Sequence, residues 1–157
     1  MYKLKTIETF DDVQDYDIFT DIVFDNFHHL NNVPHLHHTK AEIKKVLMSK
    51  KFLGLFVFNS ESKIIGYLIG EFMTLNDGRK IYYVSYFYVV TKYRKLGIGS
   101  HLINAIINKC KLREIPTIVL TCDSENDNIY NYYLTKGFMP DSKLRTHGKY
   151  EIMSLII

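Results

Sequence analysis

The feature that most constrains the fold of this chain is a basic turn with two glycines, Tyr93-Arg94-Lys95-Leu96-Gly97-Ile98-Gly99-Ser100. A run rich in aromatic and β-branched residues, 81–90, precedes the turn, and such a composition is typical of a strand. After the turn, apolar residues recur at the spacing of a helix, at Leu102, Ile103, Ile106, Ile107 and Cys110. The sequence therefore predicts a strand that passes through a glycine turn directly into a helix.

This turn is suited to binding an anion. Gly97 and Gly99 lack a Cβ, so a ligand can approach the backbone closely. The first amides of the following helix have no intrahelical partner, and the helix dipole favours negative charge beside them. Arg94 and Lys95 add positive charge at the same place. We therefore predict a phosphate-binding turn.

Two common phosphate-binding motifs are excluded. A dinucleotide-binding fingerprint needs a third glycine, but Gly99 is followed by Ser100, His101 and Leu102. A Walker P-loop needs Gly-Lys-Ser or Gly-Lys-Thr at the end of the turn, and neither occurs here. The remaining pattern is Arg94-x-x-Gly97-x-Gly99 between a strand and a helix.

The chain before the turn is predicted to contain four strands and two helices. Alternating residues predict a short strand at 2–7, and apolar spacing predicts an amphipathic helix over about 11–30. Thr39 and Glu42 are spaced as a capping box at the start of a short helix. The three strands that follow are joined by tight turns and must be antiparallel to their neighbours; they are predicted at 52–58, 64–75 and 80–90.

The chain after the turn predicts a different connection. The helix at 100–112 and a strand at 117–122 form a crossover, which implies a parallel, right-handed pair. Another helix is predicted from about Asn126, with Gly137 as its left-handed C-terminal residue, and the tail at 143–157 supplies one or two closing strands. The predicted fold class is α/β, with a mixed, mostly antiparallel central sheet, a parallel strand–helix–strand crossover and flanking helices.

Length and charge limit the class of protein. The 157 residues contain no linker or repeat, so residues 1–157 are predicted to form one domain. The formal net charge of +3 suits a small anionic ligand, and no nucleic-acid partner is expected. The start of the chain lacks the apolar centre of a secretory signal, and no apolar stretch approaches the ~20 residues that cross a bilayer. We therefore expect a cytoplasmic protein without a membrane partner, whose Cys110 and Cys122 are buried, reduced thiols.

A cluster of histidines suggests a metal site as one alternative. Five of the seven lie close together, at His28, His29, His35, His37 and His38. No cysteine lies nearby, and this spacing is not a recognised ligand pattern, so we predict no metal and a solvated or substrate-facing loop. A pH-sensitive contribution to substrate binding stays open.

The pattern from Arg94 to Gly99 resembles the acyl-CoA motif of the GNAT superfamily, the GCN5-related N-acetyltransferases. Tyr88-Val89 followed by Thr91-Lys92-Tyr93 resembles the strand and turn that lead into that motif. Further on, Asn126-x-x-Ile129-x-x-x-Tyr133-x-x-x-Gly137-Phe138 resembles the second signature, usually Asn-x-x-Ala-x-x-x-Tyr-x-x-x-Gly-Phe. Ile129 replaces the usual small residue, and we expect it to pack under its helix. The resemblance covers 81–138 and implies a GNAT fold for the whole chain.

The resemblance implies that acetyl-CoA is bound. Its pyrophosphate is expected beside Arg94, on the amides of Lys95, Leu96, Gly97, Ile98, Gly99 and Ser100. Its pantetheine arm is expected to pair with the backbone of Tyr88, Val89 and Val90, in a gap where the two parallel strands splay. Asn126 is expected to hydrogen-bond that arm.

The resemblance also implies catalytic roles. Tyr133 stands where the family has its general acid, and the spacing to Gly137-Phe138 favours it over Tyr130 and Tyr132. The base is less defined, because the positions that carry Glu or His in other members are Tyr83 and Ser85 here. Tyr83, acting through water, and Glu71 on the preceding strand are the two candidates. A nucleophilic Cys122 is disfavoured, because members of the family transfer the acetyl group directly.

The predicted function is an acetyl-CoA-dependent N-acetyltransferase that transfers acetyl directly to a primary amine. The alternative is a non-catalytic acyl-CoA-binding regulatory module, which the missing Glu or His base would suit. The segment 28–39 has no acidic cluster, which slightly favours a peptide α-amine or a modestly charged amine over a polyamine. The high aromatic content could also cover an interface in a homodimer.

Overall fold

The computed structural model is built around a sheet of seven strands, and it describes residues 1–30, 36, 38–144 and 148–157. Within this part of the chain the strand order is β1-β2-β3-β4-β5-β7-β6. Neighbouring strands are antiparallel except β4 and β5, which are parallel. The strands are β1 (Tyr2–Ile7), β2 (Phe52–Asn59), β3 (Ile64–Thr74), β4 (Lys80–Val89), β5 (Thr117–Asp123), β6 (Met139–Pro140) and β7 (Tyr150–Ile156).

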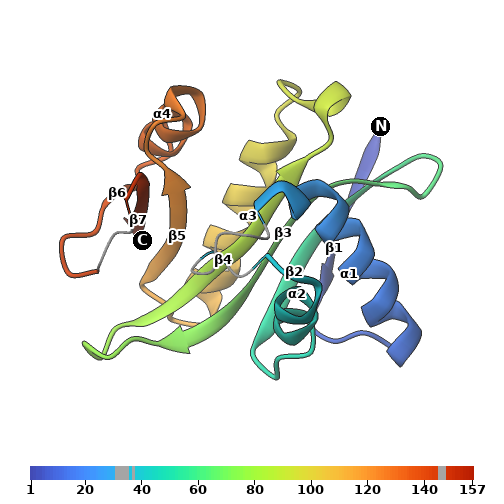
Figure 1. The fold of residues 1–157 in the computed structure, drawn as a ribbon, viewed down its shortest axis with the longest axis horizontal. Helices are drawn as coiled ribbons and strands as arrows, with labels where there is room; N and C mark the ends of the chain where they lie inside the picture. The colour runs from blue at the N-terminus through green and yellow to red at the C-terminus, as the bar shows by residue number, and fades with distance from the viewer. Residues whose placement is uncertain (31–35, 37, 145–147) are drawn as a thin grey trace.

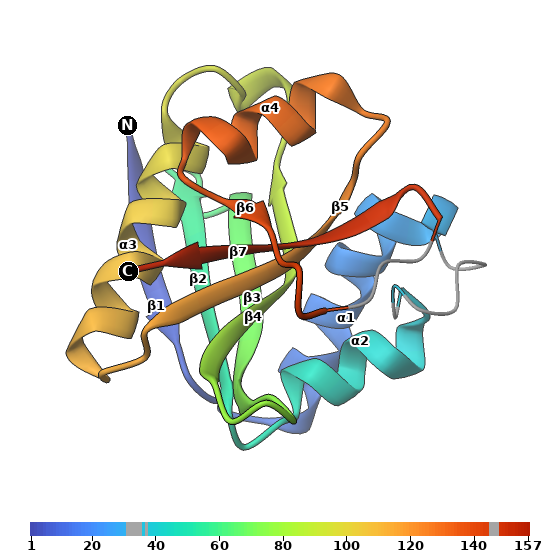
Figure 2. The ribbon, with the colours of Figure 1, turned by 90° about the vertical axis from the view of Figure 1, so that its left-hand side faces the viewer.

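Helices cover both faces of this sheet. Helix α1 (Val13–Phe27), the short 3-10 turn η1 (His28–Leu30) and α2 (Lys40–Leu47) lie on one face, and α3 (Ile98–Leu112) lies on the other (Figure 2). Helix α4 (Asp127–Thr135) follows β5 at one end of the sheet (Figure 1). No helix in the described residues is long and apolar enough to span a membrane.

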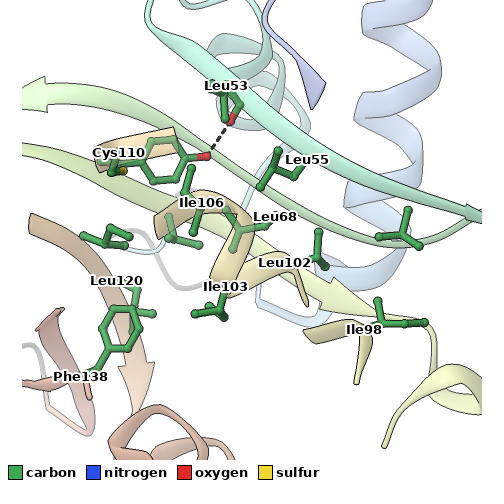
Figure 3. Close-up of a cluster of buried hydrophobic side chains, with 14 of the residues drawn as sticks. Leu53, Leu55, Leu68, Ile98, Leu102, Ile103, Ile106, Cys110, Leu120 and Phe138 are labelled. Carbon is green, nitrogen blue, oxygen red and sulfur yellow. Dashed lines mark hydrogen bonds between the residues drawn. The ribbon is translucent and has the colours of Figure 1, made fainter. Parts of the chain in front are cut away.

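Each face has its own hydrophobic core. The core under α3 joins that helix to the sheet, and Figure 3 shows Leu102, Ile103 and Ile106 of α3 beside Leu55 and Leu68. Its one deeply buried phenol, Tyr82, is satisfied because its hydroxyl donates to the Leu53 carbonyl at 2.6 Å. The core under α1 and α2 contains Val23, Ile43 and Leu47 from the helices and several aromatic rings from β2 to β4.

The predicted helix signals are confirmed. Thr39 and Glu42 form both bonds of the capping box at the start of α2. Gly137 has φ 97°, in the left-handed region expected after the last residue of α4. Helix α3 begins at Ile98, two residues before the predicted start, because its N-cap is Gly97. Ile129 is 45% exposed, so the expectation that it packs under α4 is wrong.

A β-bulge interrupts the β3–β4 pair. Ile69 pairs with Tyr86 and Gly70 pairs with Val84, so Ser85 is an extra residue in β4. The extra residue reverses the alternation of β4. Tyr82 and Val84 before the bulge, and Phe87 and Val89 after it, therefore face the α3 core, while Tyr86 and Tyr88 face α1 and α2.

The parallel strands separate just at this bulge. β4 and β5 pair only from Ile81 and Thr117 to Val84 and Leu120. Beyond that point β4 continues to Val89 and β5 to Asp123 without pairing with each other, and Figure 1 shows the two strands diverging. The predicted splay between the parallel strands is therefore confirmed.

The cysteines and histidines can be set against their predicted surroundings. Cys110 and Cys122 are buried and unpaired with each other, as predicted. His38 is buried, with its ring centroid 5.2 Å from that of Phe27 and 5.4 Å from that of Tyr86, so it is not solvated, and the alternative of a substrate-facing loop stays a prediction at this position. His35, His37 and most of the predicted loop after α1 lie outside the described residues. The two-residue strand β6 was not predicted, because it is too short to show a pattern.

Candidate active site

The glycine turn presents unpaired backbone amides at the start of α3. A 3-10 turn, η3 (Thr91–Tyr93), leads out of β4, and Lys95 and Gly97 then adopt positive φ values of 64° and 85°. The first backbone bond of α3 runs from the His101 amide to the Gly97 carbonyl. The amides at 98–100 therefore have no intrahelical partner, and no acidic side chain lies in the first turn. This end of α3 is arranged to bind an anion.

Cations surround this turn, including one that the sequence did not predict. The Arg94 Nε donates to the Val89 carbonyl at 2.7 Å, and its guanidinium lies over the Tyr88 ring. Lys136, at the C-terminal end of α4, donates from Nζ to Ser100 Oγ at 2.6 Å. A cation beside a helix N-terminus is unfavourable on its own, so this arrangement favours a bound anion. Nothing in the sequence marks Lys136 except its position before Gly137.

The part of β4 that β5 does not cover runs from the splay to the turn. Here the predicted residues Tyr88 and Val89 pair with β3 on one side, and the Val90 amide donates to the Ile65 carbonyl at 2.9 Å. Their other side is not covered by β5. The Val89 carbonyl, however, already accepts from Arg94, which sequence reasoning did not foresee.

Asn126 lies at the start of α4 as its N-cap. Its Oδ1 accepts from the Ile129 amide at 3.3 Å, which leaves the side-chain NH₂ to donate to a ligand. The residue therefore has a structural role at this position in addition to the predicted contact.

Tyr133 of α4 packs against the stretch of β4 that β5 does not cover. Its ring centroid lies 6.3 Å from that of Phe87 and 5.6 Å from that of Phe138. Burial raises the pKa of its phenol above the ordinary value, so the hydroxyl keeps its proton at neutral pH. The neighbouring Tyr132 points elsewhere: its buried hydroxyl lies against Gly99 of α3, as the rotation of a helix by about 100° per residue requires.

A cavity of about 590 Å³ lies on the α1/α2 face of the sheet. It brings together two predicted residues, Glu71 and Tyr83, which are direct cross-strand neighbours in β3 and β4. Tyr133 is not among the lining residues. The residues that line the cavity are Leu36, Glu42, Lys45, Val46, Glu71, Met73, Leu75, Tyr83, Ser85, Val119, Thr121, Leu144, Tyr150 and Ile152.

Two hydroxyl groups of this cavity lie at the splay. The Tyr83 and Thr121 hydroxyl oxygens are 2.6 Å apart and bridge β4 to β5 next to their last paired residues. Burial raises the pKa of Tyr83, although its bond to Thr121 opposes this, so Tyr83 is a neutral phenol near pH 7. Burial also raises the pKa of the Cys122 thiol to about 11, which makes it a poor nucleophile near neutral pH.

The fold and the site can now be compared with known proteins. A model of the acetyltransferase (GNAT) family matches residues 16–138. This chain belongs to that family. The family predicted from the two signatures is therefore confirmed, and so is acetyl transfer as the general activity. No curated protein matches the chain.

Solved structures share the fold of this GNAT acetyltransferase over its whole length. NAA60 from Arabidopsis thaliana, in complex with acetyl-CoA, has a TM-score of 0.73 and 14% identity, covering 100% of this chain and 99% of that one. PaiA N-acetyltransferase from Thermoplasma acidophilum, in complex with coenzyme A, has a TM-score of 0.67 and 15% identity, covering 99% of both chains. A GNAT acetyltransferase from Staphylococcus aureus Mu50 has a TM-score of 0.67 and 17% identity, covering 98% and 99%. Because the sequence identities are low, these similarities bear on the fold alone, and they confirm the predicted fold class.

Proposed function

We propose that this protein is an acetyl-CoA-dependent N-acetyltransferase that transfers acetyl directly to a primary amine. The observation that carries the proposal is the arrangement around the splay between β4 and β5. The anion-binding turn, with its cations, lies at one end of it, and a cavity that Glu71 lines lies on the α1/α2 face of the sheet. The shared fold adds support. NAA60 has been solved with acetyl-CoA and with a bisubstrate analogue, and PaiA with coenzyme A.

In this proposal the glycine turn holds the pyrophosphate of acetyl-CoA. The unpaired amides at 98–100 and the backbone of Lys95, Leu96 and Gly97 donate to it, with Arg94 and Lys136 as countercharges. The pantetheine arm runs along Tyr88, Val89 and Val90, where β5 leaves β4 uncovered. The free NH₂ group of Asn126 donates to that arm.

The proposed reaction needs two proton transfers. The amine lone pair attacks the thioester carbonyl carbon, so that a C–N bond forms and the C–S bond breaks. Tyr133 gives its proton to the departing sulfur of coenzyme A, and because burial raises the pKa of its phenol, the hydroxyl carries that proton near neutral pH. An acceptor that binds as an ammonium ion gives up one proton to solvent before its lone pair can attack, and during the transfer the amine loses a second proton to a base on the opposite face of the sheet. Alignment of the two substrates across the splay supplies the rest of the rate enhancement.

We assign that base to Glu71 and a supporting role to Tyr83. Burial raises the pKa of Tyr83 and so keeps it a neutral phenol near pH 7, which is a poor proton acceptor, and its hydroxyl is already bound to Thr121. Glu71 lies directly across the β3–β4 pair from Tyr83 and lines the same cavity. In this assignment Glu71 accepts the proton directly or through one water, and Tyr83 orients the acceptor amine.

The test compares Tyr133→Phe with Tyr130→Phe, a substitution on the same helix outside the proposed site. Release of the coenzyme A thiol is followed with a panel of amines and peptides. Tyr133→Phe keeps the ring contacts with Phe87 and Phe138, so we expect unchanged melting temperature and acetyl-CoA affinity. We expect its kcat to fall by about a hundredfold or more, whereas Tyr130→Phe stays near wild type.

Two outcomes would contradict the proposal. Turnover of Tyr133→Phe at the wild-type rate would remove the general acid from the mechanism. Binding of acetyl-CoA by calorimetry, without thiol release for any acceptor, would instead support a non-catalytic acyl-CoA-binding module.

A further inference from the structure

We infer that the acceptor is a primary amine with a single positive charge and an apolar body, bound in the 590 Å³ cavity with its ammonium group at Glu71. This inference rests on the proposed function and extends it from an unspecified amine to a chemical class. Three features of the cavity carry it: an unpaired carboxylate, the lack of a second free one, and the distribution of apolar side chains.

Glu71 has no direct ion-pair partner among the residues that the structure describes. Its side chain is half-buried on the cavity wall, yet its carboxylate forms no ion pair or hydrogen bond with any residue that the structure describes. Two other partly buried carboxylates do form ion pairs, Asp141 with Arg79 and Asp123 with Lys149. Keeping a carboxylate partly out of water without a partner is costly, and a bound ammonium group would offset that cost.

Among the described residues that line the cavity, no second carboxylate is free for another ammonium group. Glu42 also lines it, but its Oε1 already accepts from the Thr39 amide at 3.3 Å and from the Thr39 hydroxyl at 2.7 Å. Lys45 adds a positive charge to the same wall. A polyamine or an aminoglycoside would place its further charges against apolar groups or beside Lys45, and both are unfavourable.

The cavity has hydroxyl groups next to Glu71 and apolar side chains towards the end of β3. The Tyr83 and Thr121 hydroxyls lie at the splay, and Glu71 is across the strand pair from Tyr83. Half of the lining residues are apolar, among them Met73 near the end of β3 and Leu75 just after that strand. A volume of about 590 Å³ is within the usual range for small-molecule sites. The amine would therefore point to the splay, with an alkyl or aryl body among the apolar side chains.

The first experiment ranks acceptors by kcat/KM, measured as release of the coenzyme A thiol. The panel is phenethylamine, hexylamine, spermidine, kanamycin and a tetrapeptide with a free α-amine. We expect phenethylamine or hexylamine to exceed each of the other three by at least about tenfold, a difference that one unpaired charge can produce. Preference for spermidine, kanamycin or the peptide would overturn the inference while leaving N-acetyl transfer intact.

The second experiment measures binding without reaction. N,N-dimethylphenethylamine keeps its positive charge at pH 7 but cannot form a stable amide, so calorimetry on the protein loaded with coenzyme A reports recognition alone. We expect Glu71→Gln to weaken its binding by about tenfold or more. The matched control, Glu61→Gln, removes the same charge from an exposed turn outside the cavity and should bind like wild type.

The outcomes separate the inference from the proposed function. Tight, Glu71-dependent binding of the tertiary amine, with no turnover of any acceptor, supports this site but contradicts the transferase proposal. Equal binding by Glu71→Gln and wild type overturns the inference. Should Glu71→Gln fail to fold, Met73→Trp fills the cavity instead, and unchanged binding by that variant overturns it equally.

Discussion

Gly70 is the residue whose replacement should damage the fold most for the smallest chemical change. A Cβ added there would lie 2.0 Å from the Tyr83 carbonyl oxygen and 2.8 Å from the ring carbon Cζ of Tyr82. An ordinary C···O contact is about 3.3 Å, so the two strands would have to separate by roughly 1 Å. The Tyr82 ring cannot move aside, because it is fully buried and its hydroxyl is bonded to the Leu53 carbonyl. Strand β3 would therefore lose its fit to the bulge at Ser85.

We expect Gly70→Ala to lower the free energy of unfolding by about 3 kcal/mol or more, at or above the usual range for overpacking. Gly66→Ala, in the same strand, is the matched control. Its Cβ would meet a side-chain methyl of Ile98 at 3.2 Å and the Tyr88 carbonyl oxygen at 3.4 Å, and both contacts need only small adjustments. We expect that variant to lose less than about 1 kcal/mol.

Urea unfolding followed by circular dichroism measures both variants. Equal m values would show that the change lies in stability and not in the amount of surface exposed. If Gly70→Ala proved as stable as Gly66→Ala, the close approach of β3 to the bulge would not constrain the fold, and the reasoning from its geometry would be refuted.

Two further predictions concern charge. Burial raises the pKa of Asp141, but the bonds from Arg79 and Ser154 outweigh burial and lower that pKa to about 2. The resulting stabilisation of about 2 kcal/mol should be complete above about pH 4 and lost as the pH falls towards 2. The midpoint of urea unfolding should therefore decrease over this pH range. Asp141→Asn should lack this part of the decrease. Lys136→Met should raise the Kd of acetyl-CoA several-fold in dilute salt and should make that Kd less dependent on salt. The control Lys63→Met, at an exposed position, should change neither property. Titrations with acetyl-CoA at two salt concentrations measure both.

Most of the fold could be predicted because its signals are local. The antiparallel hairpins follow from short turns, the capping box from Thr39 and Glu42, and the parallel crossover from the distance between a strand and the next. The bulge could not be predicted. Strand β4 is rich in apolar and aromatic residues on both faces, so an extra residue at Ser85 leaves the pattern of hydrophobicity unchanged while it reverses which face each side chain occupies.

The candidate site divides in the same way. The glycine turn is one continuous segment, and Tyr133 has a fixed spacing to Gly137 and Phe138 in the same segment. Sequence alone was therefore enough to select both as candidates. The cavity is formed by residues from several strands and α2, and the neighbouring positions of Glu71 and Tyr83 depend on the register of β3 against β4. The contact between Lys136 and Ser100 joins two residues that are 36 positions apart in sequence, and no local pattern indicates it.

The bulge at Ser85 also bears on how such a protein can change over evolution. It divides β4 into two stretches: Tyr83 before it helps to line the cavity, and Val89 after it leads to the anion-binding turn. Because each stretch keeps its own alternation, substitutions in the first can reshape the cavity without turning the second away from its ligand. A lineage could thus exchange one acceptor for another while inheriting the donor site intact, and a laboratory library confined to Glu71, Met73 and Tyr83 could follow the same route.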